Sequence, residues 1–142
     1  MAFPEPEIGL VICYSYLWAD EAAAGRAEGR KSRPCAIVVV VQQADDLAPR
    51  VVVTPITHVP PRDPAGAIEI PQSVKRHLGL DDDRSWVVVD DVNVFQWPGF
   101  DLRPLPGTRD RYAYGVVPPR FFELIKARMM ARWRELSQTS RD

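Results

Sequence analysis

The stretch from Glu28 to Val41 reads EGRKSRPCAIVVVV, a polar, cationic loop that runs directly into a β-strand. Proline fixes φ and has no N–H group, so Pro34 suits the first residue of a strand and holds the residue before it in an extended conformation. Arg33 is therefore placed at the mouth of a strand, beside a glycine-containing loop. A guanidinium with five N–H donors is well suited to bind a phosphate from that position.

The strand that begins near Pro34 belongs to one of two long β-branched runs. Residues 35–42 and 50–58 are separated by a turn-like segment, a pattern that predicts a hairpin of two long strands. The segment before the hairpin, residues 19–32, is expected to be a helix-prone or looping insert. Shorter apolar runs predict further strands over residues 9–18, 67–70, 85–89, 91–97 and 112–117.

Two helices are expected in the second half of the chain. Ser73 can cap a short helix over residues 74–78, and Gly79 can end it. Pro119 opens the only long helix, which should end near Leu136. Its apolar face is expected to consist of Phe122, Ile125, Met129 and Trp133. Residues 138–142 are expected to be a frayed tail.

The order of these elements predicts a mainly β fold. A small antiparallel barrel or curled sheet would carry the short helix and be capped by the long C-terminal helix. At 142 residues the chain is expected to be a single domain over residues 1–142, with its core at about 8–136 and both termini frayed. The hydrophobic fraction of 46% and the charged fraction of 26% exclude a chain that is disordered throughout.

The net charge and the N-terminus restrict the partners and the location. A formal charge of −1 argues against a protein that coats nucleic acid non-specifically, so any nucleic-acid contact would come from a local patch. The first residues lack the basic and then apolar pattern of a signal peptide. The longest apolar run, residues 35–41, is far shorter than the roughly 20 residues that cross a bilayer. We therefore expect a cytoplasmic protein without a membrane partner.

The sequence offers few groups for metal, cofactor or nucleophilic chemistry. Cys13 and Cys35 lie in apolar runs, which favours buried free thiols in a reducing compartment. With two histidines, two cysteines and neither H-x-x-x-H nor C-x-x-C, no metal site is expected. The glycines form neither a P-loop nor a dinucleotide fingerprint, so no cofactor is expected. A G-x-S-x-G motif is also absent from the sequence.

The groups that remain suit a substrate that brings its own nucleophile. RNA is such a substrate, because its 2′-OH can attack the adjacent phosphate and leave a cyclic phosphate. The enzyme then supplies alignment, proton transfer and charge stabilisation. Arg33 would stabilise the charge that develops on the phosphorus centre, and the hydroxyl of Thr57, at the end of a predicted strand, could bond a phosphate oxygen.

Several motifs, spread over roughly residues 8–135, resemble in order and spacing those of the MazF/PemK family of bacterial toxins. Residues 9–12, GLVI, resemble the opening G-[DE]-[IL]-[IVW] of the family. Glu28, followed five residues later by Arg33, resembles its E-Q-x-G-x-R-P motif. Further similarities lie at residues 53–57, 68–70, 86–97 and 114–118 and in the closing helix.

The resemblance implies a fold, an activity and partners. The family consists of small SH3-like barrels that act as sequence-selective ribonucleases in type II toxin–antitoxin systems. It implies a homodimeric, metal-independent endoribonuclease that cleaves single-stranded RNA and is neutralised by a cognate antitoxin. Arg33 matches the catalytic arginine of the family, and Thr57 matches its hydroxyl beside the scissile phosphate. Glu28 matches an acid in the first loop, to which Arg30 and Lys31 add positive charge, so these three residues are expected to contact RNA.

The chain departs from the family pattern at two positions. Asn93 and Gln96 stand where the D-Q-[VP]-[KR] motif carries a basic residue and where some members add an acid. We expect these amides to contact RNA, but neither can act as an ordinary general acid or base. Proton transfer then falls to His58, Asp91 or Glu28, or the protein cuts slowly or not at all. His58 is our candidate, because an imidazole can shuttle protons near neutral pH.

Two alternatives remain open at this stage. The first is a non-catalytic toxin of the same fold that inhibits a protein target such as DNA gyrase, an alternative that the two amides favour. The second is an SH3-like binding module without toxicity. Growth arrest on expression would separate the toxins from the binding module, and the integrity of the RNA would separate the two toxins from each other.

Overall fold

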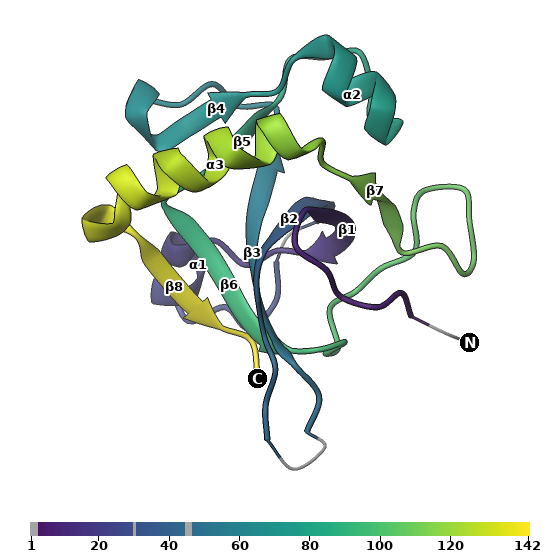
Figure 1. Cartoon of the computed structure of the whole chain (residues 1–142). Helices are drawn as coiled ribbons and strands as arrows, with labels where there is room; N and C mark the ends of the chain where they lie inside the picture. Colours follow the sequence, from purple (N-terminus) through teal and green to yellow (C-terminus); the bar gives the residue numbers. More distant parts are fainter. Residues whose placement is uncertain (1–2, 30, 45–46) are drawn as a thin grey trace.

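The structure is a computed structural model that describes residues 3–29, 31–44 and 47–142 (Figure 1). The described residues form eight strands in one sheet, and the sheet does not close on itself. The strands are β1 (Leu10–Ser15), β2 (Ser32–Val41), β3 (Arg50–Thr57), β4 (Ala67–Glu69), β5 (Trp86–Val88), β6 (Asp91–Gln96), β7 (Ala113–Val116) and β8 (Ser137–Ser140). The helices are α1 (Ala19–Ala23), α2 (Gln72–Leu78) and α3 (Pro119–Ala131). The predicted mainly β fold, a curled sheet with a short helix and a long C-terminal helix, is confirmed.

Strand β3 lies at the centre of the sheet and changes its neighbour half-way along. On one edge β3 pairs with β2 in an antiparallel register in which Cys35 is opposite Pro55. On the other edge residues 50–53 pair with β6, whereas Ile56 and Thr57 pair with β5. Pro55, which has no N–H group to donate, lies between these two partners. The end of β3 therefore lies beside β5 and the loop that precedes β5.

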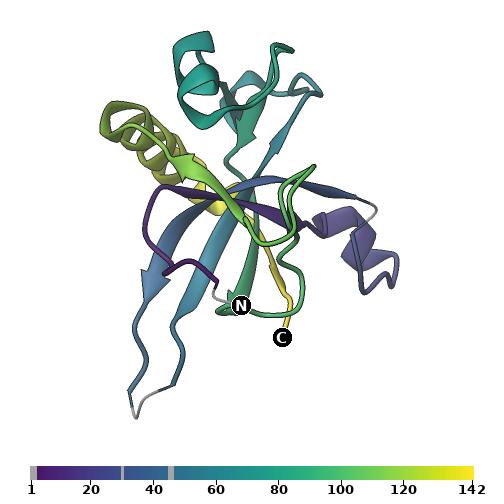
Figure 2. The ribbon, with the colours of Figure 1, turned by 90° about the vertical axis from the view of Figure 1, so that its right-hand side faces the viewer.

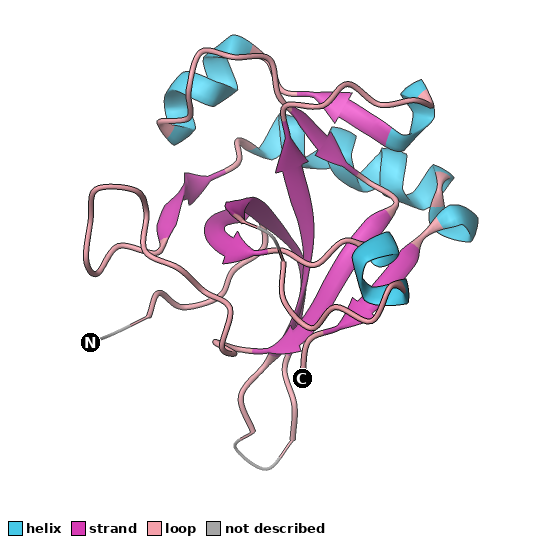
Figure 3. Ribbon diagram, turned by 180° about the vertical axis from the view of Figure 1, so that it is seen from behind, coloured by secondary structure: helices cyan, strands magenta, loops and turns pink. Residues whose placement is uncertain are grey.

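The remaining strands extend the sheet on both sides. The order along the sheet is β4-β5-β3-β2-β1-β7, with β6 beside β3 and β8 beside β6. The named strand pairs are antiparallel apart from β6 and β8, which run parallel. The β2–β3 hairpin projects from the body of the molecule (Figures 1 and 2). Seen from behind, α2 and α3 lie on the same side of the sheet, and α1 lies apart from them (Figure 3).

Strand β1 is buried on both faces, which explains its uninterrupted apolar run. Along β1, Leu10 and Ile12 belong to one core cluster, while Val11 between them belongs to the other. In the first cluster the rings of Tyr14 and Phe95 stack with their centroids 4.8 Å apart. In the second, helix α3 contributes the buried Phe121. Alternate residues of a strand point to opposite faces, so a strand with two covered faces needs apolar residues at every position.

The C-terminal region differs from the sequence-based prediction. Helix α3 ends at Ala131, and a single 3₁₀ turn (Trp133–Glu135) leads into β8 instead of a frayed tail. Polar residues make up β8, so its sequence carries no strand pattern, but the side chain of Arg141 just after it is 3% exposed and anchors it. The expected helix face was also partly wrong. Trp133 is 64% exposed, and Phe121 is buried with Ile125.

The structure also tests narrower predictions about the ends of helix α2, the two cysteines and membrane-spanning helices. Gly79 ends α2 in a left-handed conformation, as predicted, but Pro71 and not Ser73 is the residue that precedes the helix. Cys13 and Cys35 are free and buried, also as predicted. Within the described part of the chain, no helix combines the length and the apolar character needed to span a membrane.

Candidate functional site

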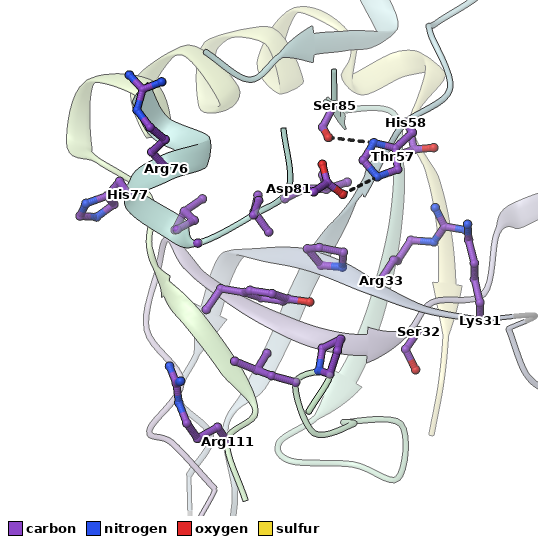
Figure 4. Close-up of a pocket in the computed structure, with 18 of the residues that line it drawn as sticks. Lys31, Ser32, Arg33, Thr57, His58, Arg76, His77, Asp81, Ser85 and Arg111 are labelled. Carbon is purple, nitrogen blue, oxygen red and sulfur yellow. Dashed lines mark hydrogen bonds and ion pairs between the residues drawn. The ribbon is translucent and has the colours of Figure 1, made fainter. Parts of the chain in front are cut away.

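The polar groups that the sequence singled out meet where β2 begins and β3 ends. Cys35 is opposite Pro55 in the antiparallel ladder, so continuing the register by two residues places Arg33 opposite Thr57. His58 follows directly after β3. Figure 4 shows Arg33, Thr57 and His58 at one end of a pocket, together with Lys31. The structure thus brings together the three residues predicted to be catalytic.

These four residues separate two pockets, and we call them the shared wall: Lys31, Arg33, Thr57 and His58 line both. The first pocket, of about 620 Å³, extends to the end of α2 and to the loop before β7. We call it the α2 pocket. The second, of about 820 Å³, extends to residues 18–21 at the start of α1 and to residues 59–62. We call it the α1 pocket. A ligand held at the shared wall can reach into either one.

The guanidinium of Arg33 lacks a counter-ion among the described residues. Its Nε atom is buried and has no hydrogen-bond partner there. The guanidinium lies over the ring of Trp18, with Cζ 5.1 Å from the ring centroid. Burial lowers the pKa of Arg33, because removal from water disfavours the charged form. The charge of Glu21 partly offsets this effect without forming an ion pair with Arg33, so the partly desolvated guanidinium is arranged to receive an anion.

The side chain of His58 is held by contacts at both ring nitrogens. Nδ1 lies 2.9 Å from the carbonyl oxygen of Arg84 and 3.1 Å from Oγ of Ser85. Nε2 lies 2.9 Å from a carboxylate oxygen of Asp81. A neutral imidazole has one N–H group and can donate to only one of the carbonyl and the carboxylate, whereas an imidazolium can donate to both. These contacts on both sides of the ring fix the orientation of the imidazole.

Thr57 presents its hydroxyl at the shared wall with one hydrogen bond already formed. Its Oγ1 atom accepts from the backbone N–H of Val59 at 3.1 Å. An oxygen that accepts this bond keeps its own hydrogen free for a further acceptor. Thr57 is 9% exposed, so the hydroxyl is fixed in place by the surrounding chain. It can therefore orient an anion that Arg33 attracts.

Sequence reasoning missed the lysine that supports this arrangement. Lys75, on α2, is 1% exposed and donates from Nζ to Asp81 at 2.8 Å and to Oγ of Ser85 at 2.9 Å. It also donates to the carbonyl oxygen of Asp83. Burial alone would raise the pKa of Asp81, but the hydrogen bond from Lys75 and the charge of His58 outweigh that effect and lower it. Lys75 thus fixes the loop that orients His58.

A second titratable group lies in the α1 pocket. Asp91 accepts hydrogen bonds from the hydroxyl of Tyr16 and, at 3.2 Å, from the backbone N–H of Ala19. Burial raises the pKa of Asp91 to about 6, and the bond from Tyr16 only partly offsets this. The sequence named Asp91 as an alternative proton-transfer group, and the structure places it in the same pocket as Arg33.

The residues expected to contact RNA are not all near the shared wall. Lys31 belongs to it and is exposed. Glu28 is exposed but lines neither pocket, and Arg30 lies outside the described residues.

The two amides are also absent from both pocket walls. Asn93 is fully buried, where it donates to the carbonyl oxygen of Leu17 at 2.8 Å and accepts from Arg141 at 3.0 Å. Its Oδ1 atom also accepts from the backbone N–H of Leu17. These hydrogen bonds join β6 to Leu17, two residues after the end of β1. Gln96 is exposed at the end of β6, and its backbone N–H donates to Asp142.

One group of side chains near the pocket has the composition of a metal site. Ligand atoms of His58, Asp81 and Asp83 lie within 4.8 Å of one another, and all three residues are exposed. Their separation in the sequence hides this group from any spacing motif. The ammonium group of Lys75 already contacts Asp81 and the backbone of Asp83, so a cation would meet a positive charge there.

Comparisons with known proteins add nothing to this geometry. No family model matches the chain, and no curated protein matches it. The resemblance to the MazF/PemK toxins therefore rests on the sequence motifs, and the chemistry of the two pockets has to be argued from their own residues.

Proposed function

We propose that this chain is a metal-independent endoribonuclease that binds single-stranded RNA with the scissile phosphate at the shared wall. The observation that carries the proposal is the guanidinium of Arg33. It is half-buried, has no carboxylate partner among the described residues, and stands between two pockets. A phosphodiester joins two nucleosides through one negative charge, so it matches a single cation with space on either side.

The proposed reaction uses the 2′-OH of the substrate as the nucleophile. The 2′-oxygen forms a bond to phosphorus, the bond to the 5′-oxygen breaks, and the products are a 2′,3′-cyclic phosphate and a 5′-OH. Asp91 takes the proton of the 2′-OH, and His58 exchanges one of its present ring contacts for the leaving 5′-oxygen, to which it gives a proton. Arg33 stabilises the charge on the phosphorane oxygens, and the hydroxyl of Thr57 orients one of them.

The proposal includes the biological role that the motifs imply. Cleavage of messenger RNA in the cytoplasm would arrest growth, and a cognate antitoxin would neutralise the chain by covering the shared wall. The active species would be a homodimer. The sequence motifs of the MazF/PemK family support this part of the proposal.

The second candidate is a toxin of the same fold that binds a target without cutting RNA. It is favoured by His58, since both of its ring nitrogens are already engaged by Arg84, Ser85 and Asp81. A histidine fixed in this way could serve only to shape an anion site.

The test is incubation of the purified protein with mixed-sequence single-stranded RNA in EDTA. Arg33→Ala is the variant, and Arg109→Ala, an exposed arginine that lines neither pocket, is the matched control. We expect discrete cuts with cyclic phosphate ends in the wild type and in Arg109→Ala, and none in Arg33→Ala. RNA that stays intact while the folded protein still arrests growth would favour the second candidate. Intact RNA without growth arrest would contradict both.

A further inference from the structure

We propose that the two pockets bind the two nucleosides that flank the scissile phosphate, with a fixed polarity. The upstream nucleoside, which carries the attacking 2′-OH, occupies the α1 pocket. The downstream nucleotide occupies the α2 pocket, together with the phosphate on its 3′ side. The preferred minimal substrate is then a dinucleotide with a 3′-terminal phosphate. This inference rests on the proposed function and specifies the substrate of the same site.

The shared wall offers one phosphate site that opens into two pockets. A phosphate at Arg33 is esterified on two sides, and the two sugars leave it in different directions. Because Arg33, Thr57 and His58 line both pockets, the two sugars enter different pockets. Volumes of about 620 and 820 Å³ are within the range of about 300–1,000 Å³ found for small-molecule sites, so each pocket can hold a nucleoside.

The α2 pocket has basic side chains beyond the shared wall that form no ion pair with a described residue. Beyond the shared wall this pocket is lined by Arg76 and Arg111, both exposed and without an ion pair to any described residue. Its one carboxylate, Asp81, is already paired with Lys75 and His58. Figure 4 shows Arg76 and Arg111 on the side of the pocket opposite the shared wall. A nucleotide that crosses the pocket therefore brings its next phosphate towards free guanidinium groups.

Beyond the shared wall, the α1 pocket has more acidic than basic side chains, unlike the α2 pocket. Asp20 and Asp91 line it without an ion pair to a described residue, Glu21 lines it and is paired with Arg26, and Arg62 is the one arginine beyond the shared wall. Carboxylates repel a further phosphate but accept hydrogen bonds from hydroxyl groups and from the exocyclic amines of bases. This pocket thus suits a ribose and a base without a second phosphate. The position of Asp91 there matches the nucleoside whose 2′-OH loses its proton.

The experiment measures the binding of uncleavable dinucleotides to the intact chain by calorimetry. The probes carry a 2′-O-methyl group on the upstream ribose, cover every base combination, and bear a 3′-phosphate, a 5′-phosphate or neither. We expect the 3′-phosphate to tighten binding about tenfold and the 5′-phosphate to leave it unchanged or weaker. Arg76→Gln combined with Arg111→Gln should abolish the gain, and Arg109→Gln should keep it. All three arginines are exposed, so these variants should fold.

Each outcome decides between the subsites and the proposed function. A gain from the 5′-phosphate, an equal gain from both phosphates, or a 3′ gain that survives the double variant would overturn the assignment of the pockets. If RNA is nevertheless cut in a reaction that needs Arg33, the proposed function stands without this inference. If no dinucleotide binds and no RNA is cut, both are wrong.

Discussion

Arg33 and Arg141 both insert a guanidinium between elements of the same sheet, and the two environments differ in one respect. Each lies over an aromatic ring, Arg33 over Trp18 at 5.1 Å and Arg141 over Tyr14 at 5.5 Å. Arg141 also has an ion pair with Asp101 at 2.9 Å and donates to backbone and amide oxygens. Arg33 has no such partner among the described residues. The fold supplies Arg141 with an ion pair and hydrogen bonds, whereas it supplies Arg33 with neither among the described residues.

The largest expected effect is the loss of activity in Arg33→Ala. Removing the donor that faces the developing charge should lower kcat/KM for RNA cleavage by about 10²–10³-fold. Arg33→Lys should restore part of that loss, because it keeps the charge but not the planar fork of donors. Urea unfolding should show a stability close to that of the wild type, since no ion pair within the described residues is broken. A large loss of stability would make Arg33 a structural residue like Arg141.

Replacing Arg141 should lower the free energy of unfolding and leave the rate of RNA cleavage unchanged. Arg141→Ala leaves Asp101 without its buried partner and removes one of the donors to the Asn93 amide oxygen, and breaking such a buried pair costs about 3–5 kcal/mol. The free energy of unfolding from urea titration measures this cost. At a temperature where the variant is folded, its kcat/KM should equal that of the wild type. A loss of activity without a loss of stability would reverse the roles assigned to the two arginines.

The third prediction uses pH to test the chemistry around Arg33. Because the pKa of Asp91 is raised to about 6, kcat/KM should rise with pH up to about pH 6 as the carboxylate forms. Asp91→Asn should remove this rise and lower the maximal kcat/KM by about 10²-fold. Asp91 should affect the free energy of unfolding in the opposite direction. The folded state holds the proton more tightly than the unfolded state, so this group favours folding increasingly as pH falls from about 6 towards 4. A profile unchanged in Asp91→Asn would assign the base to another group.

Around Arg33 and Arg141, the sequence could predict only those features whose cause lies within a few residues along the chain. Arg33 could be found because Pro34 indicates a nearby strand start, and the hairpin register then places Thr57 opposite it, although β2 begins at Ser32 and not at the predicted Pro34. Lys75 could not be found, because a lysine becomes buried only through the packing of α2 against the loop that holds Asp81 and Ser85. That contact joins segments whose sequences show no shared pattern.

The region around Arg141 could not be predicted for a related reason. Residues 137–140, SQTS, have no apolar alternation, so nothing local indicates a strand. The strand exists because Arg141 is anchored by Ser15 and Asp101, which are distant in the chain. Asn93 was expected to contact RNA because it stands in the segment that resembles the D-Q-[VP]-[KR] motif, and its amide is buried against the backbone of Leu17. Tertiary hydrogen bonds decide both cases.

The smallest expected effect distinguishes the anchor of β8 from the ion pair at its end. Arg50 contacts the carboxylate of Asp142, but their side chains are 37% and 40% exposed. Solvent-exposed pairs contribute about 0–1 kcal/mol, and salt screens them further. Arg50→Ala should therefore lower the free energy of unfolding by less than about 1 kcal/mol in urea titrations, and still less at high salt. If this variant were as damaging as Arg141→Ala, β8 would be held at its end and not by the buried guanidinium. Burial of Arg141 would then not be what secures the strand, and Arg141 could no longer serve as the structural counterpart of Arg33.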